Sequence, residues 1–302
     1  MGRTGGGRGS NQYRIKGVSQ ARRRPRTASN PESPLVPTPA IVDRWGALLS
    51  NFPTYPGDYQ AVPEPVWDDL SPSVASIEPK GRERAVGRYR IRQSHALFDD
   101  ARLEGFAFTE PEIHTLINGG HVAGHTVGEE AQVAGLKRAS DFMLNRVDEG
   151  IRLEPSQALS DDLHLFIAAP LGLKSTAFRG EQKEQYEGPR VRLGGGEEFR
   201  ALDARLTPAV LAAGLNRIGR IGHPVLRAVT WAAFATYQQF YLDGNKRTGR
   251  YAMNAVIMSH GFDAILIPEH VKAQYEDALV ESYRTGDLTP HIAFLLAQYS
   301  DR

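Results

Sequence analysis

The chain has 302 residues, of which 41% are hydrophobic and 24% are charged, with 36 basic and 35 acidic side chains. These proportions are ordinary for a globular protein and exclude a fibrous protein or a chain that is disordered throughout. There is no cysteine, which excludes a disulfide scaffold, a thiolate nucleophile and a cysteine-ligated metal centre. No stretch reaches the roughly eighteen apolar residues of a membrane span. We therefore expect a soluble, cytoplasmic protein without a membrane partner.

The first part of the chain is predicted to be a disordered basic tail, residues 1–40. Residues 1–29 carry eight basic side chains and no acidic one, so the rest of the chain has a formal net charge of −7. Glycine, arginine and proline dominate the tail, and such compositions bury too little apolar surface to fold. A weaker alternative is that the cluster from Arg22 to Arg26 contacts nucleic-acid phosphates. Residues 41–83 mix a short apolar stretch with proline-rich loops and are predicted to form an extension that packs on the body.

From about residue 84 the pattern becomes helical and predicts one domain, residues 84–302. Ile91, Leu97 and Leu103 are assigned to one face of a helix that ends at Gly105. Thr109, followed three residues later by a glutamate, is a capping-box arrangement that predicts a new helix start. Further helices are predicted at 128–147, 156–171, 206–219, 223–242, 246–261, 268–286 and 288–300.

One segment, residues 172–203, departs from the helical pattern. It combines a polar loop with the stretch VRLGGGEEFRAL, whose glycines and β-favouring residues indicate a short hairpin. The predicted fold class is therefore mostly α with one small β element.

The segment most informative about function begins where a long apolar helix stops at Asp243, Gly244 and Asn245. Asp-Gly-Asn favours a turn. Because a second helix starts directly after this turn, several backbone N–H groups there have no intrahelical partner. These amides and the positive end of the helix dipole favour an anion.

Charged side chains around this turn strengthen the prediction of a polyphosphate pocket. Arg247 and Arg250 lie three residues apart and can reach the same anion, and Lys246 adds a third cation. Asp243, at the mouth of such a site, is a natural ligand for Mg²⁺, which binds carboxylates together with substrate phosphates. The alternative is a simple link between two helices whose arginines are solvated.

The segment Gln239–Arg250, QFYLDGNKRTGR, resembles the signature of the Fic (filamentation induced by cAMP) family, HPF-x-D/E-GN-G/K-R-x-x-R, with agreement from Asp243 onward. The likeness extends to HPVLRAVTWAAF before the motif, to GRYAMNAVIMSHGF after it, and to DDLHLF and AFRG further upstream, so that it covers residues from about 90 to 298. It implies a Fic-like helical bundle with the motif at 239–250. It also implies a β-hairpin flap at about 172–203, which in this family presents the target side chain.

The resemblance also implies roles for individual residues. The carboxylate at the position of Asp243 holds Mg²⁺ on the phosphates of ATP. The family's phosphate-binding positions fall on Gly244, Asn245, Lys246, Arg247 and Arg250. Most characterised members transfer AMP from ATP to a hydroxyl of a target protein. The Doc branch has lysine at the position of Lys246 and transfers phosphate, but other members also carry lysine there, so both reactions stay open. Fic proteins often self-associate, which makes a homo-oligomer an expectation here.

The chain departs from the family at the general base. The family has histidine where this chain has Gln239, followed by Phe240 and Tyr241 in place of the usual proline and phenylalanine. A carboxamide does not take up a proton near neutral pH, and loss of a positioned base costs about 10²–10⁴ in rate. Two hypotheses follow: a phosphate-binding protein without the standard reaction, a pseudoenzyme, or a nucleotidyl- or phosphotransferase with a non-standard base.

A second family feature is an inhibitory helix with the pattern S/T-x-x-x-E-G/N. Residues of the segment at about 94–105 match it at Glu104 and Gly105 but have Asp100 where serine or threonine is usual. The resemblance implies that Glu104 pairs with Arg250 and competes with a phosphate for the same guanidinium. The alternative is a solvated surface glutamate.

Overall fold

The computed structural model describes residues 65–173, 176–181 and 187–299. Within these ranges the chain is mostly helical and contains one two-stranded antiparallel hairpin, which confirms the predicted fold class. The basic tail and residues 41–64 of the extension lie outside the described residues. None of the helices in the described ranges is long and apolar enough to cross a membrane.

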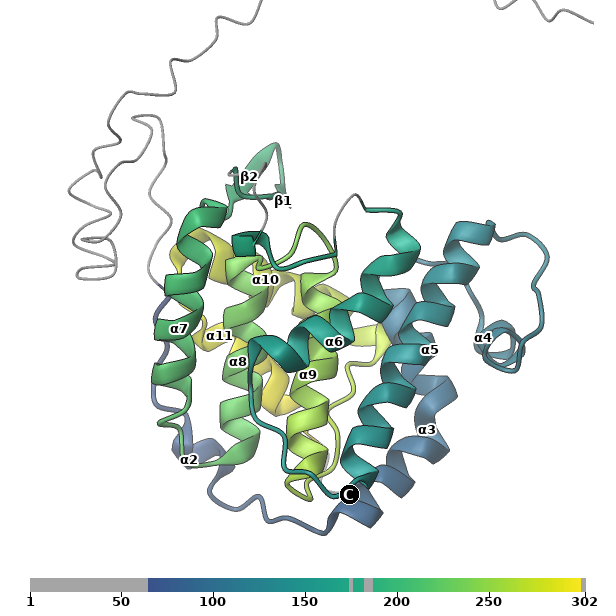
Figure 1. Ribbon diagram of the computed structural model, residues 1–302, viewed down its shortest axis with the longest axis horizontal. Helices are drawn as coiled ribbons and strands as arrows, with labels where there is room; N and C mark the ends of the chain where they lie inside the picture. The colour runs from purple at the N-terminus through teal and green to yellow at the C-terminus, as the bar shows by residue number, and fades with distance from the viewer. Residues whose placement is uncertain (1–64, 174–175, 182–186, 300–302) are drawn as a thin grey trace, which may run out of the picture.

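The order of the elements follows the helical periodicity of the sequence (Figure 1). The helices are α2 Ser71–Val74, α3 Arg82–Leu103, α4 Glu110–Ile117, α5 Val127–Asp148, α6 Gln157–Ala168, α7 Thr207–Ile218, α8 Pro224–Gln238, α9 Asn245–Ser259, α10 Lys272–Thr285 and α11 Thr289–Ala297. The strands are β1 Arg190–Gly194 and β2 Glu197–Arg200. Both Thr109 and Thr126 form capping boxes at the starts of α4 and α5.

Helices α8 and α9 form the centre of the bundle. In α9 every residue except Lys246 is buried, and the helix contacts α3, α5, α6 and α8. Helix α7 flanks α8 on one side, α5 lies on the other side of α9, and α6 crosses in front of α9 (Figure 1). A Cβ atom on Gly249 would lie 3.3 Å from the carbonyl oxygen of Ala232, so glycine permits the close approach of α8 and α9.

The hairpin is attached to the bundle by aromatic packing. Strand β1 pairs with β2 so that Val191 lies opposite Phe199. The buried ring of Phe199 lies 5.1 Å from the ring of Tyr237 on α8 and 4.7 Å from that of Tyr283 on α10, between centroids. These contacts hold the hairpin over the end of α8. The predicted hairpin is confirmed, although its strands lie within residues 190–200 of the segment 172–203.

Two predicted details differ from the structure. The side chain of Ile91 is 87% exposed, because steps of six and twelve residues place it about 120° from both Leu97 and Leu103 around the helix, opposite the buried stripe between them. Helix α8 ends at Gln238 rather than at residue 242, because Gln239 adopts a left-handed conformation.

The described part of the extension does contact the body: Val66 forms a parallel bridge with Asp287, and the Arg217 guanidinium lies 3.8 Å from the centroid of the Trp67 ring.

Candidate functional site

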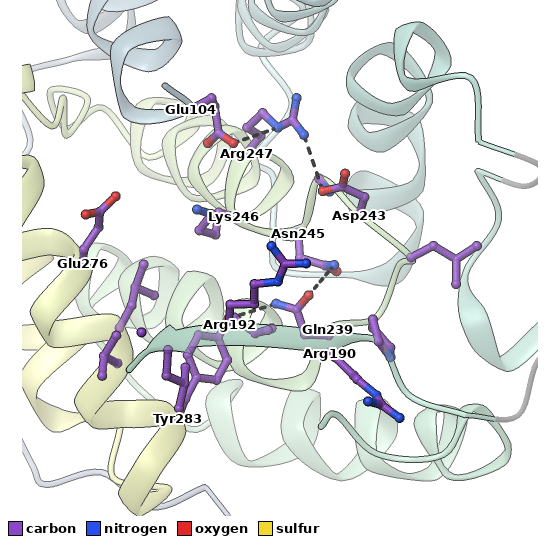
Figure 2. Close-up of a pocket in the computed structure, with 18 of the residues that line it drawn as sticks. Glu104, Arg190, Arg192, Gln239, Asp243, Asn245, Lys246, Arg247, Glu276 and Tyr283 are labelled. Carbon is purple, nitrogen blue, oxygen red and sulfur yellow. Dashed lines mark hydrogen bonds and ion pairs between the residues drawn. The ribbon is translucent and has the colours of Figure 1, made fainter. Parts of the chain in front are cut away.

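A cavity of about 810 Å³ opens where the loop between α8 and α9 meets the hairpin and α10. Residues 242–247 form one wall, β1 forms a second, and Glu276 and Tyr283 of α10 belong to a third. Figure 2 shows these side chains around a common space, with Glu104 of α3 at its edge. The segment singled out from the sequence therefore lies at this cavity.

The start of α9 is built to leave its backbone amides available. Gly244 is the N-cap with a φ of 75°, a left-handed conformation that favours glycine. A Cβ atom there would also lie 3.3 Å from Cε1 of His164. No side chain caps the helix, and its first turn contains no acidic residue. Lys246, in that turn, forms no ion pair with any described carboxylate and lines the cavity. Uncapped amides, the helix dipole and a free cation together make this wall suitable for an anion.

Gln239 braces the loop with its whole carboxamide. Its φ of 51° is the only positive value among the described non-glycine residues. The side-chain Nε2 donates to the carbonyl oxygen of Thr236 at 2.6 Å and to the hydroxyl of Tyr283 at 2.9 Å. Its Oε1 accepts from Nδ2 of Asn245 at 3.0 Å (Figure 2). Every hydrogen-bonding group of the carboxamide therefore already has a partner within the protein.

Asn245 and Arg179 hold the same loop from two other directions. The side chain of Asn245 accepts from the backbone N–H of Tyr241 at 2.9 Å and donates to its carbonyl oxygen at 2.9 Å. The buried Arg179 donates to the carbonyl oxygens of Gln238 and Gln239. It also donates to the carbonyl oxygen of Leu202, which follows strand β2. The loop is thus preorganised by buried hydrogen bonds, and the side chain of Asn245 is engaged in bracing it.

One histidine, His164 of α6, lies beneath the loop. Its ring stacks on Tyr241 at 3.7 Å between centroids, and Nδ1 lies 2.9 Å from Oγ1 of Thr248. Burial, together with the positive charge of Arg247, lowers the pKa of His164 to about 3, so the ring is neutral at physiological pH. No histidine lines the cavity in the described part of the chain, and His223, at the start of α8, contacts the carbonyl oxygen of Ile77 instead.

Both arginines of the motif contact carboxylates of α3. Arg250 donates from Nη2 to Glu104 Oε1 at 3.1 Å and from Nε to Asp100 Oδ1 at 3.0 Å. Arg247 Nε lies 3.4 Å from the other oxygen of Glu104. The two arginines therefore do reach one anion, and that anion is the Glu104 carboxylate. Arg250 is 5% exposed and is not among the residues that line the cavity.

The two carboxylates of this cluster respond differently to their surroundings. Burial raises the pKa of Glu104, but the charges of Arg250, Arg247 and Lys246 outweigh it, so the pKa of this carboxyl lies below its ordinary value. For Asp100 burial prevails over the attraction of Arg250, and its pKa is raised. Glu104 is consequently the carboxylate that keeps its negative charge most firmly against these arginines.

Asp243 has an exposed carboxylate at the cavity mouth. Its side chain is 59% exposed, with Oδ1 3.6 Å from Nη2 of Arg247 and 2.5 Å from the backbone nitrogen of Gly244. The described residues contain no group of three or more histidine and acidic side chains that could hold a metal ion. Mg²⁺ commonly takes only one or two carboxylates and completes its coordination with water and phosphate oxygens. The donor set at Asp243 fits that mode of binding.

The structure brings together at one cavity the residues predicted from the motif, with the exception of Arg250, which lies behind Glu104. Sequence reasoning missed three contributors: Arg192 of β1, Tyr283 of α10, and Gln132 of α5, whose Oε1 accepts from Arg247 Nη1 at 3.2 Å. Of these three residues, only Arg192 could have been identified from the sequence. Arg190 and Arg192 share one face of a strand by their spacing, in a hairpin already predicted to lie near the motif.

Comparison with known proteins gives short sequence matches and long structural ones. No family model matches the chain. It is 34% identical over 74 residues to the protein adenylyltransferase Fic of Drosophila grimshawi, a match that covers 23% of this chain and 15% of that protein. The corresponding protein of Drosophila persimilis is 32% identical over 74 residues, or 23% of this chain and 14% of that protein. The matched region thus spans about one seventh of the curated relatives.

Three solved structures resemble the fold over most of its length. A Fic family protein from Desulfovibrio desulfuricans G20 has a TM-score of 0.55 and 17% identity, over 80% of this chain and 74% of that one. A Fic domain containing signaling protein from Bacteroides thetaiotaomicron has a TM-score of 0.56 and 16% identity, over 76% and 89%. Fic-1 from C. elegans has a TM-score of 0.52 and 17% identity, over 76% and 66%. The described part of this chain has the Fic fold.

Proposed function

We propose that this chain binds ATP, or a related phosphate ligand, at the loop Asp243–Arg247. The observation that carries the proposal is the uncapped start of α9, which lies on the wall of an 810 Å³ cavity together with the unpaired Lys246. Backbone amides at a helix start, a nearby ammonium group and an open cavity suit a phosphate chain. Asp243 would hold Mg²⁺ on that chain, where the ion would neutralise phosphate charge.

Glu104 regulates the site in this proposal. Its carboxylate contacts Arg247 and Arg250, which are the guanidinium groups that a distal phosphate would use. A carboxylate and a phosphate compete for the same donors. The pKa of Glu104 is lowered despite its burial because of the charges of Arg250, Arg247 and Lys246, so the buried carboxylate stays ionised against these groups.

The chemistry that follows binding depends on Gln239. Its carboxamide does not take up a proton near neutral pH and is held by three hydrogen bonds, which supports a phosphate-binding protein that lacks the standard proton transfer. A second candidate is an active AMP transferase or a Doc-like phosphotransferase that acts on a protein hydroxyl with a different base. The name of the Drosophila relatives, protein adenylyltransferase, favours this alternative. Positioning and electrostatic contributions to the rate could persist without the histidine.

The test combines binding with transfer. The wild-type chain and the Glu104→Gly and Asp243→Ala variants are each titrated with ATP and Mg²⁺ by calorimetry. Each is also incubated in cell lysate with ATP labelled at the α or at the γ position. We expect ATP binding that is tighter in Glu104→Gly and weaker in Asp243→Ala, and no labelled protein.

Each other outcome has a distinct meaning. Label from α-labelled ATP that is stronger in Glu104→Gly and absent in Asp243→Ala establishes AMP transfer and replaces the first candidate by the second. Label only from γ-labelled ATP establishes phosphate transfer. A wild-type chain that neither binds ATP nor transfers label contradicts the proposed function.

A further inference from the structure

Arg192 is a cation on the hairpin side of the cavity. It lies on β1, is exposed, and lines the same cavity as the start of α9. Figure 2 shows its side chain reaching from the strand toward Asn245, whereas Arg190 points away from that loop. No described carboxylate lies within ion-pair distance of Arg192.

Arg192 has no carboxylate partner among the described residues because the two glutamates of the hairpin pair with other arginines. Glu198 lies directly opposite Arg192 in the register, but its carboxylate contacts Nη1 of Arg190 at 3.4 Å. The neighbouring Glu197 accepts from Nη2 and Nε of Arg284 on α10, at 2.6 and 2.9 Å. Both acids of the hairpin are therefore engaged by other arginines.

The carboxylates on the cavity wall are engaged as well. Glu104 contacts Arg247 and Arg250, Asp243 contacts Arg247, and Glu276 lies 3.9 Å from Nζ of Lys272. Lys246 at the start of α9 and Arg192 on β1 thus line the cavity without an ion pair to any carboxylate of the described residues. They stand on different walls, so an anion between them would contact both.

We propose that Arg192 is a phosphate-binding residue that contacts the phosphate chain of a nucleoside polyphosphate from the hairpin side. The proposal rests on the proposed function and assigns part of the binding to a residue outside the loop and α9. A guanidinium can donate two parallel hydrogen bonds to a phosphate, which a lone ammonium cannot. The guanidinium of Arg250 is bound by Glu104 and Asp100. Arg192 would therefore provide a guanidinium group that is available to bind the phosphate. Such a ligand also joins the hairpin to the bundle.

Arg190 provides a matched control for the test. It has the same charge, lies two residues away on the same strand, is likewise exposed and also lines the cavity, but it is paired with Glu198. Arg192→Ala, Arg192→Lys and Arg190→Ala are titrated with ATP and Mg²⁺, and separately with inorganic tripolyphosphate, by calorimetry. We expect Arg192→Ala to raise the Kd about tenfold, or roughly 1.4 kcal/mol. Arg190→Ala is expected to change it less than about twofold, and Arg192→Lys to fall between the two.

The outcomes separate this inference from the proposed function. Wild-type binding that Arg192→Ala leaves unchanged, or that Arg190→Ala weakens equally, overturns the role of Arg192 and leaves the proposed function standing. A wild-type chain that binds neither ATP nor tripolyphosphate overturns both. A larger loss in Arg192→Ala for both ligands supports a contact with phosphate rather than with the nucleoside. Thermal unfolding confirms that the variants are folded, since neither arginine is buried.

Discussion

At the scale of single residues, Gln239 shows how the fold imposes a geometry that the residue alone would avoid. A left-handed backbone conformation costs a non-glycine residue about 1–2 kcal/mol. The hydrogen bonds to Thr236, Tyr283 and Asn245 offset this cost, since each contributes about 0.5–1.5 kcal/mol. Burial raises the pKa of Tyr283, so its hydroxyl stays protonated and donates in turn to the carbonyl oxygen of Thr236 at 3.1 Å. The side chain of Gln239 is therefore a structural brace.

Gln238 and Gln239 make a matched pair for testing this brace. Both are buried, but the carboxamide of Gln238 has no hydrogen-bond partner in the described part of the chain. Gln239→Met removes three hydrogen bonds and leaves Nδ2 of Asn245 with only its bond to the carbonyl oxygen of Tyr241, so we expect it to lower the free energy of unfolding by about 1–3 kcal/mol. Gln238→Met replaces an unsatisfied polar group with an apolar one of similar size, and we expect no loss. Urea unfolding of the two variants measures the difference, and equal losses would show that the hydrogen bonds of Gln239 contribute nothing.

At the scale of secondary-structure elements, local sequence predicted element boundaries correctly wherever a residue type strongly favours one conformation or position. Thr109 predicted the start of α4, the glycines near 194–196 predicted a turn between strands, and Gly244 marked the break between α8 and α9. The face of α3 was misassigned at Ile91, because apolar residues alone do not identify which stripe meets α5 and α9. Arg192 was missed for a related reason. Its importance depends on which carboxylates its neighbours take, and this is decided by packing between elements.

Close contact between α7 and α8 gives a prediction at this scale. A Cβ atom on Gly214 of α7 would lie 2.2 Å from Cζ of Phe234 on α8, whose ring lies 5.8 Å from that of Phe240 in the loop, between centroids. Gly214→Ala therefore overpacks the interface, and we expect a loss of about 1–3 kcal/mol in the free energy of unfolding.

Gly87 in α3 serves as its control, because a Cβ atom there meets no atom within 4 Å. Gly87→Ala gains helix propensity without a clash, so we expect stabilisation by up to about 1 kcal/mol. Chemical denaturation of both variants checks the pair. If Gly214→Ala stabilised the chain as much as Gly87→Ala, the close packing of α7 on α8 would be contradicted.

At the scale of the whole molecule, the candidate site is assembled from distant parts of the chain. Glu104 comes from α3, Arg192 from the hairpin, Lys246 from α9 and Tyr283 from α10. The local sequence predicted the phosphate-binding loop, but the side chains of the other elements reach this cavity only through packing between segments far apart in the chain. The charge of the chain is divided as well: eight basic side chains lie in residues 1–29, and the remainder carries a formal net charge of −7.

This division of charge predicts where any affinity for nucleic acid resides. An acidic body repels phosphates, so binding to duplex DNA must come from the tail. If the four arginines from Arg22 to Arg26 contact phosphates, affinity falls by about 10²-fold between 50 and 200 mM salt. We expect weak binding by the full-length chain at low salt, and none after deletion of residues 1–40. A variant with these arginines changed to serine, which preserves the tail's length, is expected to lose the binding too. Fluorescence anisotropy with labelled duplex DNA measures all three. Binding that survives the deletion, or that does not vary with salt, would assign the interaction to the body and contradict this role of the tail.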